Sequence, residues 1–154
     1  MNLPLSRVTG ILSLALALGC SEATAPTTLD AAAPTLAEVL AHKSLWSAQK
    51  LSNYSYHYTV TGYFILWKDR ELTLHVSNGR VTAAVFTATG KSLPDPADLP
   101  SIDRLFDMAE QAARDGTLEA IEFDSRLGYP ARMDLAGPPD ASGSVFAVGL
   151  EAER

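Results

Sequence analysis

The chain has 154 residues, with 12 Lys and Arg against 18 Asp and Glu, which gives a formal net charge of −6 at pH 7. An acidic chain without runs of basic and aromatic residues is poorly suited to bind nucleic acid or anionic lipid surfaces, so neither is expected as a partner. Cys20 is the only cysteine, which excludes an intrachain disulfide and a cysteine-rich metal site.

The N-terminal segment has the layout of an export signal. Arg7 is its one cation, residues 8–18 are almost wholly apolar, and Gly19 precedes Cys20. This order predicts a signal peptide over residues 1–19. The apolar run is about half of the roughly 20 residues that a bilayer-spanning helix needs. A plain secretory signal, or an N-terminal helix with an incidental cysteine, stays open as the alternative.

The same segment resembles the signal of bacterial lipoproteins, which implies lipidation of Cys20 after residues 1–19 are removed. By that resemblance, Ser21 after the cysteine favours the outer membrane, facing the periplasm, if the host is Gram-negative. Residues 20–33 lack apolar periodicity and predict a flexible tether with a reach of roughly 20 Å. Residues 34–154 are enough for a single domain.

The first half of this domain predicts a helix and three strands. Thr35 and Glu38 form a capping box for a helix that runs to about Lys50. Alternating residues predict strands over 54–67 and 72–77 with a turn at 68–70, and a third strand follows the Asn78-Gly79 hairpin signal. A row of tyrosines on the first strand is expected to face the core under Trp46, namely Tyr54, Tyr56 and Tyr58.

Counting back from the Asn78-Gly79 turn predicts the register of its hairpin. The expected opposite pairs are all apolar: Val76 and Val81, Leu74 and Ala83, Leu72 and Val85.

The second half predicts a helix from Ser101, as its N-cap, to Gly116, which ends it. Strands are expected over 118–124, 131–135 and 145–150, with a loop over 136–144. Hairpin connections then give an α+β fold, an antiparallel sheet of about six strands with two helices packed on one face, in the order α-β-β-β-α-β-β-β.

The histidines and carboxylates are the candidate metal ligands of the domain. If the turn after the first strand is centred on Asp69, His57 and His75 lie about six residues apart, on the order of 20 Å. Zinc needs its ligands within about 2 Å, so no metal site and no cofactor is expected. Glu122 and Asp124 are expected on a solvated strand face with Arg126 and Arg132 as ion-pair partners, although paired carboxylates can also serve acid–base chemistry or bind calcium.

Four short motifs between about residues 46 and 148 resemble a family of uncharacterised bacterial lipoproteins, catalogued only as a domain of unknown function. The resemblance implies an envelope lipoprotein and gives no activity. The motifs are Trp46 with Tyr54-x-Tyr56, the hairpin Val76-Ser77-Asn78-Gly79-Arg80-Val81, Ser101-Ile102-Asp103-x-Leu105-Phe106, and Phe123-Asp124-x-x-x-Gly128-Tyr129-Pro130.

The sequence therefore predicts a lipid-anchored protein of the cell envelope, without catalytic residues, that binds an envelope protein or a small ligand. Tyr129, Arg132 and Asp124 are the candidate binding residues, because the turn could hold the Tyr129 ring at the rim of a groove. The alternative is a small-ligand carrier or envelope enzyme with a groove near the 125–144 hairpin and loop. A third reading, a subunit of an assembly, requires an exposed apolar patch above a few hundred Å².

Overall fold

The computed structural model describes residues 34–62, 70–137 and 142–153. The predicted signal peptide, Cys20, the tether and positions 68 and 69 of the first predicted turn lie outside these residues. None of the described helices has the length and apolar character to cross a membrane.

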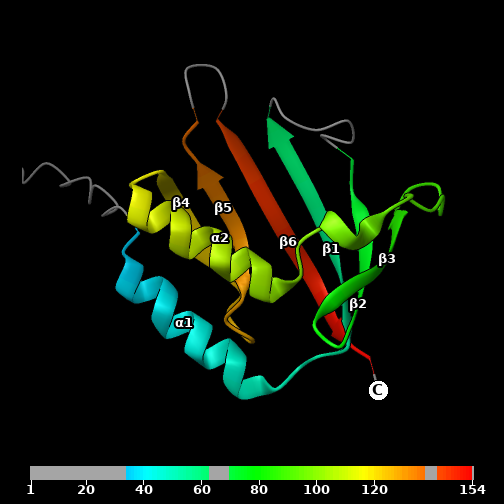
Figure 1. Cartoon of the computed structure of the whole chain (residues 1–154), viewed down its shortest axis with the longest axis horizontal. Coiled ribbons are helices and arrows are strands. Elements are labelled where there is room, and N and C mark those ends of the chain that lie inside the picture. Colours follow the sequence, from blue (N-terminus) through cyan, green and yellow to red (C-terminus); the bar gives the residue numbers. More distant parts are fainter. Residues whose placement is uncertain (1–33, 63–69, 138–141, 154) are drawn as a thin grey trace, which may run out of the picture. The chain divides into compact units, whose positions relative to one another are not determined.

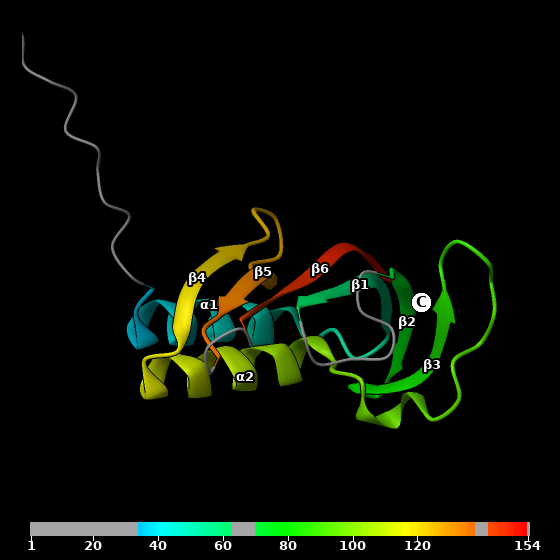
Figure 2. The ribbon, with the colours of Figure 1, turned by 90° about the horizontal axis from the view of Figure 1, so that it is seen from above.

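Six strands form one antiparallel sheet, and both helices pack against the same side of it (Figures 1 and 2). The strand order β3-β2-β1-β6-β5-β4 places the first and last strands together at the centre of the sheet. The predicted α+β class and the order of its elements are confirmed. The elements are α1 (Leu36–Gln49), β1 (Tyr54–Gly62), β2 (Leu72–Ser77), β3 (Arg80–Phe86), the short 3₁₀ helix η1 (Pro96–Asp98), α2 (Ile102–Asp115), β4 (Leu118–Phe123), β5 (Pro130–Leu135) and β6 (Gly143–Ala152).

The predicted caps fix the ends of both helices. The Thr35 hydroxyl accepts the N–H of Glu38 at the start of α1, and the Ser101 hydroxyl accepts the N–H of Arg104 at the start of α2. Gly116 ends α2 in the left-handed region, with φ of 70°. Each cap satisfies backbone groups that a helix end leaves without a partner.

The tyrosine row of β1 lies in the core beneath the helices, as predicted. Trp46 of α1 meets the Tyr54 ring edge-on, with the ring centroids 5.6 Å apart. The Tyr54 hydroxyl accepts the N–H of Ile102 at 3.0 Å, and the Tyr56 hydroxyl donates to the carbonyl of Pro100. These two bonds hold β1 to the start of α2.

The predicted register of the β2–β3 hairpin is correct at one rung only. Val76 pairs with Val81, but Leu74 pairs with Ala84 and Leu72 with Phe86. The register shifts between His75 and Val76 because Thr82 is an extra residue on β3, and its hydroxyl donates to the His75 carbonyl. Such a bulge moves every later pair by one residue.

The predicted separation of His57 and His75 is wrong. Tyr58 pairs with Leu72, so the β1–β2 register is centred on position 65 and not on Asp69. His57 therefore lies opposite Thr73, and His75 opposite Ser55, an offset of two residues or about 7 Å along the strands. Each Nδ1 instead faces its own carboxylate, Glu71 at 3.4 Å from His57 and Glu153 at 3.1 Å from His75.

Candidate functional site

Asp124, one of the three candidate binding residues, organises the turn between β4 and β5. Its Oδ1 accepts the N–H groups of Arg126 at 3.0 Å and Leu127 at 2.7 Å. Its own N–H donates to the carbonyl of Tyr129, and its carbonyl accepts the N–H of Gly128. A carboxylate engaged by two backbone amides serves as the cap of the turn.

Tyr129 lies in the core and not at the rim of a groove. Only 2 % of its surface is exposed, and its ring meets Trp46 edge-on at 6.1 Å. Burial, with a smaller contribution from the charge of Asp124, raises the pKa of the Tyr129 hydroxyl. Tyr129 therefore belongs to the layer between α1 and the sheet.

Arg132 lies on the opposite, helix-free face of the sheet. Its guanidinium contacts Asp134 at 2.7 Å and Glu122 at 3.2 Å, and it lies 5.8 Å from the centre of the Phe146 ring. A hydrogen bond from Ser144 and then the contact with Arg132 hold the pKa of Asp134 below its usual value. The structure thus places the three candidate residues in a turn, in the core and on the far face, and brings no two of their side chains into one site.

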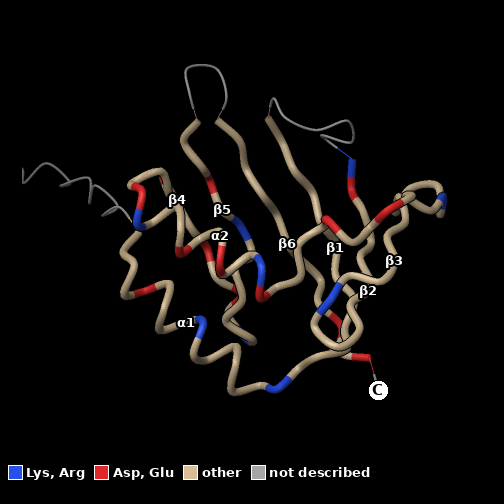
Figure 3. The backbone as a smooth tube through the Cα atoms, in the orientation of Figure 1, with Lys and Arg blue, Asp and Glu red and all other residues tan. Residues whose placement is uncertain are grey.

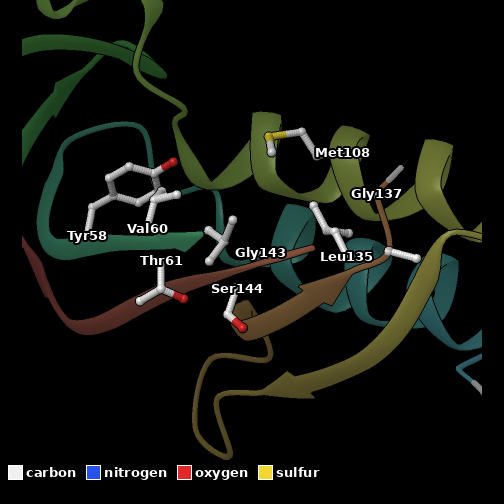
Figure 4. A pocket seen from close by; sticks show the side chains of 10 residues that line it. Tyr58, Val60, Thr61, Met108, Leu135, Gly137, Gly143 and Ser144 are labelled. Carbon is white, nitrogen blue, oxygen red and sulfur yellow. The ribbon is translucent and has the colours of Figure 1, made fainter. Parts of the chain in front are cut away.

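An apolar cavity of about 320 Å³ lies where β1, β5 and β6 meet α2. Figure 4 shows Tyr58, Val60 and Leu135 projecting from the strands toward Met108 of α2. The cavity lies on the helix side of the sheet, near the described ends of the 136–144 loop. Its lining residues are Tyr58, Val60, Thr61, Met108, Leu135, Ala136, Gly137, Gly143, Ser144 and Val145.

Two glycines pair with each other beside this cavity, and one of them, Gly143, belongs to its lining. Gly62 of β1 lies opposite Gly143 of β6. A Cβ on Gly143 would stand 2.7 Å from the carbonyl oxygen of Thr61, and a Cβ on Gly62 would stand 2.7 Å from that of Ser142. Real Cβ atoms essentially never approach another heavy atom this closely, so a side chain at either position would force the strands apart. Glycine at this rung lets the two backbones approach closely.

Among the described residues, those that line the cavity include no Asp, Glu, Lys, Arg, His or Cys. Its one titratable group is the hydroxyl of Tyr58, and burial raises the pKa of Tyr58 to about 12. This hydroxyl therefore stays protonated over the physiological range and can only donate or accept a hydrogen bond. The mostly apolar lining suits an apolar group. The described lining residues offer neither a general base nor an activated nucleophile at neutral pH.

The lining residues of the cavity carry no sequence signal of a site. Val60 and the β6 valine Val145 follow the same alternation that marks ordinary core positions, so nothing in the pattern sets them apart. Gly62 was the available signal, since a glycine inside a strand marks a close approach of another backbone.

Within residues 34–62, 70–137 and 142–153, no three His, Cys, Asp or Glu side chains gather so as to hold a metal ion. In the same part of the chain, the exposed large apolar side chains are Leu40 and Leu45 of α1 and Val148 of β6. Because α1 and the helix-free face of β6 lie on opposite sides of the sheet, these side chains form no common patch.

A family model described as a family of unknown function, DUF6174, matches residues 38–143. The search of curated proteins and the search of solved structures each returned no match.

Proposed function

This chain belongs to the DUF6174 family of unknown function, and from that premise we propose that it is a lipid-anchored, non-enzymatic protein of the cell envelope that binds a small apolar ligand. The cavity between α2 and the ends of β1, β5 and β6 carries the binding part of this proposal. Its volume of about 320 Å³ falls at the lower end of the range for small-molecule sites, and its lining is mostly apolar.

The lack of convergent reactive groups favours binding over catalysis. Enzyme sites bring a base, a nucleophile or an oxyanion donor within hydrogen-bond reach of one point. Asp124, Tyr129 and Arg132 are each engaged in separate structural contacts. Tyr58 is the polar side chain that projects from the described strands toward the cavity (Figure 4). Lys and Arg positions are spread among acidic ones over several elements (Figure 3), which does not suit a nucleic-acid partner.

The anchoring part of the proposal rests on the sequence pattern that ends at Cys20. Under this proposal the protein lies in the cell envelope, on the periplasmic side of the outer membrane in a Gram-negative host, and the lipid attaches it to the membrane. Replacing Cys20 by Ala should move the protein from the membrane fraction to the soluble fraction and abolish incorporation of a labelled fatty acid. Persistence of the label in Cys20→Ala would refute lipidation at this residue.

The binding part is tested with the mature chain carrying Cys20→Ala, so that no lipid competes. The probe is the neutral apolar fluorophore N-phenyl-1-naphthylamine, which brightens when it leaves water. Val60→Trp should fill the cavity and abolish the fluorescence gain. Val148→Trp, which adds the same ring to the far face of the sheet, should leave it unchanged.

Equal fluorescence in these two variants would contradict ligand binding in the cavity. Because a tryptophan at position 60 could also disturb the sheet, Met108→Trp serves as a second filling variant from the helix side. Far-UV circular dichroism checks that all variants remain folded. Cross-linking in whole cells, with Cys20→Ala as control, tests the further possibility that an envelope protein is the partner.

A further inference from the structure

A polar groove along α2 adjoins the apolar cavity. The groove is lined by eight residues and shares two of them, Met108 and Leu135, with the cavity. The two hollows are therefore neighbours at these side chains. The groove residues are Arg104, Asp107, Met108, Gln111, Ala112, Asp115, Thr117 and Leu135.

The charged side chains of the groove differ in how they are engaged. Lys43 of α1 binds Asp107 at 2.9 Å, and the amide of Gln111 donates to Asp115 at 2.9 Å. Among the residues that the structure describes, the Arg104 guanidinium makes no hydrogen bond or ion pair. Arg104 is also the only cation that lines either hollow.

Arg104 is placed to reach a group that emerges from the cavity. It lies four residues before Met108 on α2, so the two side chains are neighbours on one helix face, with Cβ atoms about 5–6 Å apart. Asp115 accepts a hydrogen bond from Gln111 and pairs with no cation among the described residues. It lies seven residues beyond Met108, two turns further along the helix. Asp107 also lines the groove beside Met108, but it is paired with Lys43. Arg104 is therefore the charge without a described partner at this end of the groove.

We propose that the ligand is a single-chain amphiphile with an anionic head, whose alkyl chain enters the cavity while its carboxylate or phosphate binds Arg104. This inference rests on the proposed function, because it takes the cavity as the binding site. At roughly 30 Å³ for each water-sized group, the cavity of about 320 Å³ holds a chain of about ten carbons. The hydroxyl of Tyr58 remains neutral and adds no charge against the chain.

The test measures the affinity of four ten-carbon probes for the mature chain carrying Cys20→Ala. Decanoate and decyl phosphate have anionic heads and distinguish a fatty acid from a phosphate-headed lipid fragment, decanol is neutral, and decyltrimethylammonium is cationic. We expect at least one anionic probe to bind roughly fivefold to tenfold more tightly than decanol, and this preference to shrink at high salt.

Arg104→Gln should lower the affinity for the anionic probes to that of decanol and leave decanol binding unchanged. Arg114→Gln is the matched control. It removes the same charge from the same helix at a residue that pairs with Glu110 outside the groove, and it should preserve the preference.

The outcomes separate the two proposals. Equal binding of all four probes, an equal loss for decanol and decanoate in Arg104→Gln, or a preference for the cationic probe would overturn the anionic head while leaving the cavity as a binding site. If no probe binds, or if Val60→Trp has no effect on binding, the proposed function fails together with this inference.

Discussion

Alkaline pH should expose the buried phenol of Tyr58 as a measurable part of the stability of the fold. Its side chain is 4 % exposed and makes no hydrogen bond to a described residue. Burial raises the pKa of Tyr58 from 10.0 to about 12. Between these values the unfolded chain releases the proton while the folded chain retains it, so stability is full below pH 10 and falls as pH rises toward 12.

The size of this effect follows from the two pKa values. The free energy of unfolding should fall by about 2 kcal/mol between pH 10 and 12, since each pKa unit corresponds to about 1.4 kcal/mol and each state is half ionised at its own pKa. Tyr58→Phe removes this contribution and leaves the packing of the ring in place. The variant should therefore match the wild type at pH 9 and exceed it by about 2 kcal/mol at pH 12.

Urea denaturation at a series of pH values, followed by far-UV circular dichroism, measures both curves. Titration of tyrosine absorbance at 295 nm gives an independent reading of the pKa. Burial raises the pKa of Tyr54 to about 12 as well, so this tyrosine contributes equally to both proteins and cancels in their difference. Parallel curves for the wild type and Tyr58→Phe over pH 9–12 would refute the reasoning.

Three further predictions concern the links between elements. Tyr54→Phe leaves the buried N–H of Ile102 without its acceptor and should cost about 1–3 kcal/mol in urea denaturation; a loss below about 0.5 kcal/mol would mean that water replaces the hydroxyl. Gly143→Ala forces a Cβ against the Thr61 carbonyl and should lower stability by about 1–3 kcal/mol, whereas an unchanged melting temperature would show that the strands can separate. Lys43→Met removes the ion pairs from α1 to Asp107 and Glu110, so its deficit in melting temperature should shrink in 1 M NaCl; a deficit independent of salt would assign it to packing.

Local signals were sufficient to predict most of the fold. The caps Thr35 and Ser101 and the Asn78-Gly79 turn act over three or four residues, and the structure has each of them as expected, with positive φ at both Asn78 and Gly79. The tyrosine row of β1 was also predictable, because strict alternation puts one face of a strand into the core.

The features that were not predicted depend on distant backbone contacts. The bulge at Thr82 and the centre of the β1–β2 register at position 65 depend on how whole strands pair. The β2–β3 error came from counting residues outward from a turn, which assumes no insertion in either strand. The β1–β2 error came from centring the turn on Asp69.

The surroundings of the candidate residues could not be predicted for a related reason. Tyr129 was expected near a groove from its position beside Pro130, yet α1 brings Trp46 over it from more than 80 positions away in the sequence. The cavity forms between α2 and strands from both halves of the chain, and its apolar lining resembles ordinary core in the sequence. A hollow of this kind depends on the volume that side chains leave unfilled, which alternation of polar and apolar residues does not encode.

The central position of β1 and β6 has a consequence for how the protein is made. The pairing of β1 with β6 brings Tyr54 opposite Ala152. Without this pairing the sheet would consist of two separate groups of three strands. During synthesis β1 gains its second neighbour only after β6 has been produced, and pairings between such distant segments form slowly. If the chain is exported as proposed, this delay favours passage across the membrane as an unfolded chain, with the sheet closing on the far side.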